Sequence, residues 1–262
     1  MKINCILAAV MSLCIIGGTM PYLAETGTSS IITADAANYT DETIDGFRYY
    51  IYSDHAAFRG VDATVKGKIS IPEKVKDLPV TEMTDNALYY NKNVTSVVLP
   101  KTMKVIGSQA FFYASNLESV TLNEGLETIK SGAFKGCSKL AEITIPDSVT
   151  AIEDNAFRDC TSLTDAVIGD GLETISYGLF AHCSALSSVQ IGSNVKTIEN
   201  YVFNACSSLT SISIPDSVTS IGNEVFAGCS FTKFKLGKNV KTIGEAIFSS
   251  CKLLKGISKN PF

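Results

Sequence analysis

The chain has 262 residues, of which 45% are hydrophobic and 18% are charged, with 22 Lys and Arg against 26 Asp and Glu. A chain of this length and apolar content can bury a large core, which argues against intrinsic disorder. The basic residues are scattered and the net charge is -4, which argues against nucleic acid as a partner. Only two histidines, His55 and His182, are present, so histidine-based metal sites and catalytic triads have few ways to form.

The N-terminal segment has the pattern of a secretory signal peptide. A short basic start precedes an apolar run over residues 3–18, which is shorter than the roughly 20 residues that a membrane span requires. Ala34, Asp35 and Ala36 form a cleavage pattern, so we expect residues 1–36 to be removed, with a cut after Ala24 as the alternative. No second hydrophobic segment follows. The mature chain is therefore predicted to be secreted or at the cell surface, without a membrane span.

From residue 80 onwards one pattern recurs at a nearly constant spacing. Phenylalanine returns in steps of 23 residues, with one last step of 22, at Phe111, Phe134, Phe157, Phe180, Phe203, Phe226 and Phe248. Isoleucine stands five residues before each of them, at Ile106, Ile129, Ile152, Ile175, Ile198, Ile221 and Ile243. A leucine position follows each Phe, and Phe231 occupies it in the shortened unit. Seven units in one register predict a repeat architecture.

A period of 23 residues is typical of leucine-rich solenoids. Short alternating stretches predict strands with their apolar side chains turned inward, at residues 120–122, 143–145, 189–191, 212–214 and 234–236. Pro146 and Gly169 close two of these strands at the same point, because Pro cannot continue a ladder and Gly bends freely. Since no coil can bury its own apolar residues, the coils must stack, and solution scattering of the mature chain should show an elongated particle.

Residues 209–229, with the sequence LTSISIPDSVTSIGNEVFAGC, carry an Ile-x4-Phe-x2-Cys signature. The unit resembles the BspA-type leucine-rich repeat of bacterial and protist surface proteins over about residues 69–258. An aromatic stretch at 47–52, followed by Ile-Ser-Ile-Pro at 69–72, is similar to the usual opening of that family. With the signal peptide expected at 1–36, the resemblance implies two further parts: an N-terminal cap at 37–72 and a leucine-rich repeat solenoid at 73–262.

The fold class expected from this resemblance is an α/β-type repeat with an aromatic β cap. Its coils are expected to be rich in β-strand, with short turns or helical segments between the strands. Members of the family are typically secreted or cell-surface proteins, and some are implicated in adhesion to host matrix proteins or other cells. The resemblance therefore implies a role in protein binding or adhesion.

Six cysteines stand three residues after a repeat phenylalanine, at Cys137, Cys160, Cys183, Cys206, Cys229 and Cys251. An exported chain with an even number of cysteines suggests disulfides, and stacked Cα atoms about 4.8 Å apart fall within disulfide range. In-register side chains point in parallel, however, so a bridge would require the backbone to shift. We favour free buried thiols, and distance alone leaves bridges between neighbouring coils open. Zinc is disfavoured because ligands along a line cannot converge tetrahedrally.

No catalytic, cofactor-binding or metal-binding residues are predicted, and the chain is expected not to be an enzyme. His182 precedes Cys183, but Gly136, Asp159 and Ala205 hold the same repeat position, which indicates a tolerant turn position rather than a catalytic dyad. His55 lies beside Asp54 in the expected cap, where a surface or structural role is favoured. No glycine-rich phosphate loop occurs, and no cofactor is implied.

The candidate binding face consists of the outward positions of the repeated strands. These side chains are small and hydroxyl-rich in the middle, acidic near one end and basic near the other: Ser119, Thr121, Glu142, Thr144, Asp165, Ser188, Gln190, Ser211, Ser213, Lys233 and Lys235. A repeated surface of this kind suits an extracellular protein or glycan, recognised by shape and many weak contacts. The alternative is that Ser and Thr only solvate a sheet for which they have a good propensity.

The favoured function is a secreted or surface-associated binding or adhesion module. An enzyme acting on extracellular polymers would need clustered titratable residues that break the repeat, and none is visible outside the cap; a spacer without a specific ligand is the third hypothesis. The last unit is expected to expose Ile243, Phe248, Leu254 or Ile257 beside an unpaired strand edge. This predicts self-association through the C-terminal coil, or a partner that covers it. In the alternative, residues 260–262 fold back over the edge.

Overall fold

The computed structural model describes residues 39–232, 234–254 and 257–258. Its contacts divide the chain into two units, Met1–Asp35 and Ala36–Phe262. The first unit, the predicted signal peptide at 1–36, Lys233 and residues 260–262, whose fold-back was the alternative to self-association, all lie outside the described residues. Within the described part, no helix is long and apolar enough to cross a membrane.

The N-terminal end of the second unit is an antiparallel ribbon of three strands, β1 (Thr40–Ile44), β2 (Phe47–Ile51) and β3 (Ala56–Val61). The aromatic stretch expected in the cap forms β2. Asp45 and Gly46 join β1 to β2 and both have positive φ, the backbone of a tight two-residue hairpin. Strand β3 then pairs in parallel with β6 (Leu78–Met83), which also pairs with β5 (Lys74–Val75), so the cap continues directly into the repeats.

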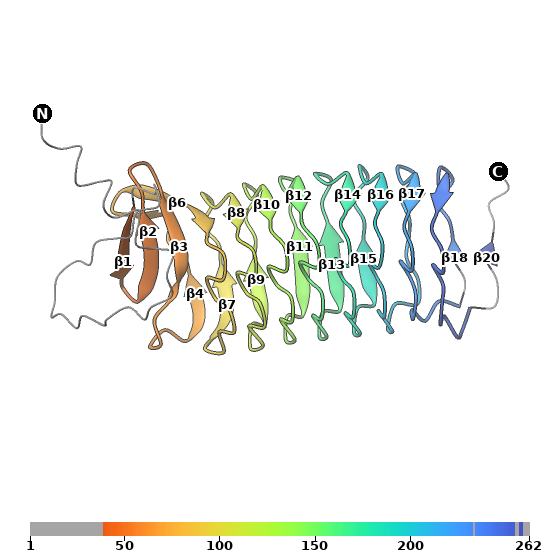
Figure 1. Cartoon of the computed structure of the whole chain (residues 1–262), viewed down its shortest axis with the longest axis horizontal. Helices are drawn as coiled ribbons and strands as arrows, with labels where there is room; N and C mark the ends of the chain where they lie inside the picture. Colours follow the sequence, from red (N-terminus) through yellow and green to blue (C-terminus); the bar gives the residue numbers. More distant parts are fainter. Residues whose placement is uncertain (1–38, 233, 255–256, 259–262) are drawn as a thin grey trace, which may run out of the picture. The chain divides into compact units, whose positions relative to one another are not determined.

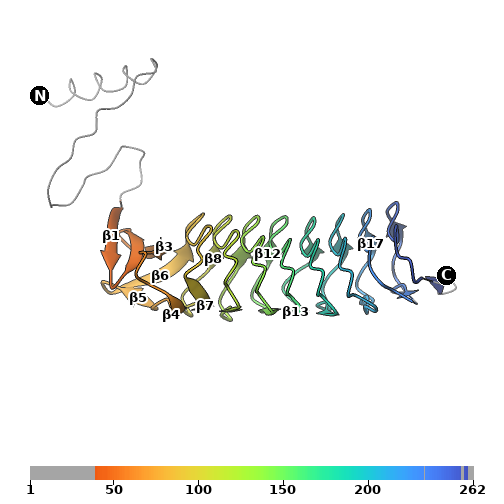
Figure 2. The same cartoon turned by 90° about the horizontal axis from the view of Figure 1, so that it is seen from below.

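The repeats form coils that stack in one row, as Figures 1 and 2 show. One face carries the longer strands, of three to five residues, and then two strands of two residues in line with them: β4 (Gly67–Ser70), β7 (Val94–Val98), β9 (Ser119–Thr121), β11 (Glu142–Ile145), β13 (Asp165–Ile168) and β15 (Ser188–Gln190), followed by β18 (Phe234–Lys235) and β20 (Ile257–Ser258). The other carries β8 (Val105–Ile106), β10 (Thr128–Ile129), β12 (Ala151–Ile152), β14 (Thr174–Ile175), β16 (Thr197–Ile198), β17 (Ser220–Ile221) and β19 (Thr242–Ile243). Pairing between coils is parallel, with partners such as Ile129 and Ile152 one repeat apart.

The repeat phenylalanines form a continuous column inside the stack. Phe111, Phe134, Phe157, Phe180, Phe203 and Phe226 are fully buried. The ring centroids of successive members lie 4.7–5.9 Å apart, and their planes differ by no more than 14°. The 23-residue period therefore places each ring directly on the ring of the next coil, which confirms the predicted solenoid and its register.

The expected helical segments and the α/β designation are wrong: the described residues contain no helix, and the solenoid consists of strands and turns. The cause is a left-handed backbone two residues before and two residues after each repeat phenylalanine. Around Phe134 these residues are Gly132 (φ 60°) and Gly136 (φ 76°). Two left-handed residues four positions apart stop any helix, and the Gly136 amide donates to the Arg158 carbonyl of the next coil at 2.8 Å.

The six repeat cysteines are free, and five of them are buried. Each thiol donates to the backbone carbonyl of the repeat phenylalanine in the preceding coil, for example Cys137 to Phe111, at S···O distances of 3.0–3.3 Å. Burial raises the pKa of the Cys137 thiol, and it raises that of Cys229 to about 12. The thiols therefore behave as small buried groups that satisfy a carbonyl, as in other interiors.

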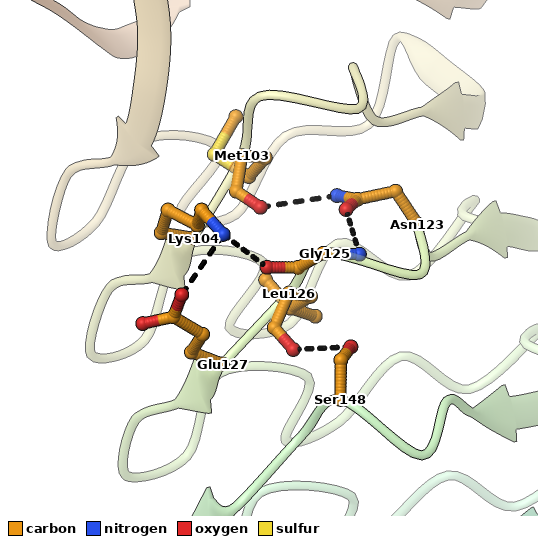
Figure 3. A network of polar contacts seen from close by, with 7 residues as sticks. All are labelled: Met103, Lys104, Asn123, Gly125, Leu126, Glu127 and Ser148. Carbon is orange, nitrogen blue, oxygen red and sulfur yellow. Dashed lines mark hydrogen bonds and ion pairs between the residues drawn. The ribbon is translucent and has the colours of Figure 1, made fainter.

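Polar side chains also connect successive coils (Figure 3). Asn123, a buried polar residue, donates from Nδ2 to the Met103 carbonyl at 3.2 Å and accepts the Gly125 amide at 2.7 Å. The Ser148 hydroxyl donates to the Leu126 carbonyl at 2.7 Å. In the turns after the longer strands, backbone groups are no longer paired by strand-to-strand hydrogen bonds. These side chains supply the missing partners.

One expected strand is absent. The segment at 212–214 lies in the described part but is not hydrogen-bonded as a strand. The longer strands and the two in line with them form three separate ladders, β4-β7-β9, β11-β13-β15 and β18-β20. The chain is one residue shorter between Cys229 and Phe231 than in the other coils, which shifts the register by one. A hollow of about 510 Å³, lined by Ile212, Ile214 and Leu236 among others, lies between the two coils.

The last described coil is more open than the others. Ile243 is 41% exposed, and Phe248 and Leu254 are only partly buried. This agrees with the exposure expected for Ile243, while Phe248 and Leu254 still pack against the core. The Ile257 side chain lies outside the described residues, although the backbone of β20 pairs with β18.

Candidate binding surface

Most residues predicted for the binding face lie on the face that carries the longer strands. Register pairs place Ser96 beside Ser119, Glu142 beside Asp165 and Asp165 beside Ser188, with Thr144, Val167 and Gln190 in a second row. Every predicted member that the structure describes is solvent-accessible: Ser119, Thr121, Glu142, Thr144, Asp165, Ser188, Gln190, Ser211, Ser213 and Lys235. We call this set the strand strip. Ser211 and Ser213 lie outside any strand, and Lys233 lies outside the described residues.

The electrostatics of the strand strip are uneven. Glu142 and Asp165 are register partners and exposed, and neither forms an ion pair within the described part of the chain. Like charges directly opposite on neighbouring strands repel each other. Two hydroxyls, Ser96 Oγ and Ser119 Oγ, are hydrogen-bonded to each other at 2.8 Å. The strip therefore offers an acidic pair between two stretches of hydroxyl groups.

A hollow of about 560 Å³ lies where the cap meets the first coils, and the sequence did not reveal it. We call it the cap pocket. It is lined by Arg48 and Tyr50 of β2, by Tyr52 directly after β2, and by Arg59 of β3. These side chains occupy alternate, outward positions of the ribbon, while Tyr49, Ile51 and Phe58 are buried on its other face. The only sequence signal is this alternation of polar and aromatic residues in the cap, which the repeat pattern obscures.

The coils supply the rest of the lining, including Glu82, Asp85, Asn86 and Lys130. Asp85 Oδ1 accepts the Ser108 amide at 2.7 Å, which holds that carboxylate in place. Burial, with a contribution from Glu82, raises the pKa of Tyr52. The buried Nε of Arg48 has no hydrogen-bond partner within the described residues.

An exposed aromatic cluster lies on the turns of the first two coils. Tyr89 stacks on Phe112 at 5.1 Å, and Tyr90 stacks on Tyr113 at 5.4 Å, with each pair within 9° of parallel. Tyr90 is 50% exposed. Tyr90 and Tyr113 have φ near 50°, a left-handed conformation that is unfavourable for bulky residues. Rigid exposed tyrosines are typical of protein-binding hot spots.

The histidines do not assemble a catalytic group. The Cys183 thiol is buried and donates to the Phe157 carbonyl, whereas the exposed His182 ring lies 3.3 Å from Arg158 Nη2. His182 has φ 64°, so its position is the left-handed one, which explains why Gly and Asp recur there. His55 stacks on Tyr52 at 4.4 Å and bonds to Asp54 at 2.7 Å. Among the described residues, no group of three or more His, Cys, Asp and Glu could hold a metal ion.

Parallel coils of about 23 residues, with columns of Phe, Ile and Cys, define the class of leucine-rich repeat solenoids. The family model described as BspA type Leucine rich repeat region matches residues 81–209 and 173–260, with 6 copies. The chain therefore belongs to the BspA-type leucine-rich repeat family. This confirms the resemblance inferred from the Ile-x4-Phe-x2-Cys signature.

Solved structures of bacterial leucine-rich repeat proteins are similar to this chain. A leucine rich cell surface protein from Faecalibacterium prausnitzii A2-165 is 28% identical, with a TM-score of 0.62, over 83% of this chain and 54% of its own. A leucine-rich repeat protein from Bacteroides ovatus ATCC 8483 is 25% identical, with a TM-score of 0.58, over 82% of this chain and 70% of its own.

The T. pallidum leucine-rich repeat protein is 24% identical over 82% of this chain and 91% of its own, with a TM-score of 0.57, and shares the fold. The chain spans about half the length of the Faecalibacterium protein. Comparison with curated proteins finds no match.

Proposed function

We propose that this protein is a secreted or cell-surface-associated binding module, which mediates adhesion to an extracellular protein or glycan through the strand strip. The observation that carries the proposal is the in-register display of outward side chains over successive coils, within one ladder from β7 to β9 and a second from β11 to β15. A sheet that repeats the same backbone at regular intervals can make many weak contacts with one extended partner.

The chemistry of the strip favours a partner rich in donors. Glu142 and Asp165 offer acceptors without a compensating cation, and hydroxyls lie on both sides of them. A basic protein segment, or a glycan whose hydroxyls donate to these carboxylates, would relieve their mutual repulsion. The description of the Faecalibacterium protein as a cell surface protein supports the proposed location.

The test is a direct binding assay of residues 37–262 against immobilised host matrix proteins and glycans. Thr144→Lys combined with Ser188→Lys adds two long cations to the strip and should abolish capture of the partner. Thr150→Lys combined with Ala151→Lys adds the same charge at exposed positions outside the strip and should leave capture unchanged. Equal loss with both pairs, or capture that neither pair affects, would overturn the strip as the binding surface.

Self-association through the C-terminal coil stays a prediction. Its basis is the exposure of Ile243 at 41% and Leu253 at 53% in that coil. Sedimentation velocity over a hundredfold range of concentration tests it: a rising mass should return to the monomer value in Ile243→Lys. A constant monomer mass would contradict the prediction.

A further inference from the structure

The cap pocket has the size of a small-ligand site and a mostly polar lining. Its volume of about 560 Å³ falls within the range of roughly 300–1,000 Å³ that such sites occupy. Its lining combines two tyrosines, Tyr50 and Tyr52, with arginine, lysine, carboxylate and amide groups. None of its lining residues belongs to the strand strip, so this pocket is a separate site from the surface proposed above.

The charges that line the pocket balance. Arg59 is ion-paired with Asp41, which leaves Arg48 and Lys130 to face the carboxylates of Glu82 and Asp85. An anionic ligand would meet two carboxylates, and a cationic ligand would meet two cations. The pocket therefore matches an uncharged ligand that donates and accepts hydrogen bonds in equal measure, as hydroxyl groups do.

Several of the lining groups are held in place by contacts outside the pocket. The Arg59 guanidinium lies over the Tyr50 ring at 4.7 Å, besides its ion pair with Asp41. The Tyr52 ring is stacked on His55, with an interplanar angle of 6°. Groups fixed in advance lose little freedom when a ligand binds, so their hydrogen bonds contribute fully to affinity.

One donor has no partner. The buried Nε of Arg48 makes no hydrogen bond within the described residues. That atom is itself closed to solvent, so a ligand would meet other parts of the Arg48 side chain, which lines the pocket.

We propose that the cap pocket binds one terminal sugar of an uncharged glycan. A pyranose presents hydroxyls that both donate and accept, which suits the mixture of Arg48, Lys130, Glu82 and Asp85. It also presents apolar C–H groups, which suit the parts of the Tyr50 and Tyr52 rings that Tyr39, Arg59 and His55 leave open to the pocket. The site does not depend on the strand strip, so either surface can bind while the other does not.

The test starts from an array of glycans with neutral termini (hexoses, N-acetylhexosamines and deoxyhexoses) and acidic termini (sialic and uronic acids), probed with residues 37–262. The best neutral monosaccharide is then titrated by calorimetry or NMR. Binding of neutral termini alone is the expected result. Preference for acidic termini, or binding of none, would overturn the proposal.

Asn86→Gly is the sharpest variant. Asn86 lines the pocket and has φ 58°, a conformation that Gly adopts without strain, so the substitution removes the side chain and keeps the backbone. Affinity for the monosaccharide should fall about tenfold, the effect of one lost ligand hydrogen bond. Asn155→Gly is the matched control. Asn155 has the same φ of 58° at the same repeat position, three coils beyond Asn86, and it does not line the pocket.

Lys130→Met and Tyr52→Phe test the other walls and should each weaken binding by about three- to tenfold. The Thr144→Lys and Ser188→Lys pair on the strip should leave the titration unchanged. If the strip pair and the pocket variants weaken binding equally, or if Asn86→Gly and Asn155→Gly behave alike, the sugar does not bind in the cap pocket.

Discussion

The middle coils and the last described coil carry the same sequence pattern and differ in burial. Ile175 and Phe180 are fully buried, whereas Ile243 is 41% exposed and Phe248 is partly buried. The residue types and spacings are the same, but the middle residues are covered by a coil on each side. In a solenoid, burial is thus a property of neighbouring coils rather than of the unit that carries the residue.

The largest expected effect comes from the phenylalanine column. Phe180→Ala should lower the free energy of unfolding by about 3–5 kcal/mol, because it leaves a cavity between Phe157 and Phe203. Phe248→Ala should cost about 1.5 kcal/mol, because less apolar area is buried there. Denaturant unfolding measures both, with Ser188→Ala on the exposed strip as a control of little effect. Equal costs at 180 and 248 would remove the contrast between the two regions.

Gly136→Ala should cost about 1–3 kcal/mol. Gly136 has φ 76°, and a Cβ there would lie 2.8 Å from the Tyr113 ring, which is itself stacked on Tyr90. Thermal unfolding measures the cost. The companion variant Gly132→Ala shares a positive φ, but its Cβ would meet nothing closer than 3.6 Å. A similar loss from both would attribute the whole effect to backbone conformation rather than to the stacked ring.

Buried thiols should make the protein less stable in alkali. Burial raises the pKa of Cys229 to about 12, whereas an unfolded thiol ionises near roughly 8.5. The unfolded state therefore loses this proton first, and stability present below pH ~8.5 declines as pH rises toward 12.

Between about pH 8.5 and 12, this thiol should lower the free energy of unfolding by about 1.4 kcal/mol per pH unit. Cys229→Ala should remove that part of the pH dependence. The measurement is denaturant unfolding at several pH values from 8 to about 10.5, compared with the native chain. Cys251→Ala should remove less, because Cys251 is only partly buried in the open coil. An unchanged pH slope in Cys229→Ala would contradict the burial of that thiol.

The smallest effect should be the same in both regions. Ala205 and Ala246 have φ 60° and 54°, and Gly at either position should raise stability by up to about 1 kcal/mol. Backbone strain is local, so the gain should not depend on whether a further coil covers the residue. A gain at Ala205 alone, measured by thermal unfolding, would mean that strain is also set by stacking.

The sequence by itself determined the repeat, its register and the composition of the core. Residues at one repeat position are covered by the same positions of the neighbouring coils, so a 23-residue spacing of Phe, Ile and Cys predicts stacked columns without any coordinates. It also placed the strand strip, because side chains alternate across a strand and the inward set is apolar. The recurrence of Gly, Asn and Asp at positions such as 132, 136, 155 and 159 signals the left-handed turns that replace the expected helices.

Only the tertiary structure decided the features that arise between different segments. The cap pocket joins β2 and β3 to coils up to Lys130, and no spacing in the sequence encodes that proximity. The tyrosine stacks require Tyr90 and Tyr113 to accept an unfavourable backbone, which residue type alone argues against. The segment at 212–214 forms no strand although it alternates like the others, and the coil after it is one residue shorter. Local preference fixes each coil, and contact between coils decides what each coil buries, exposes or leaves unpaired.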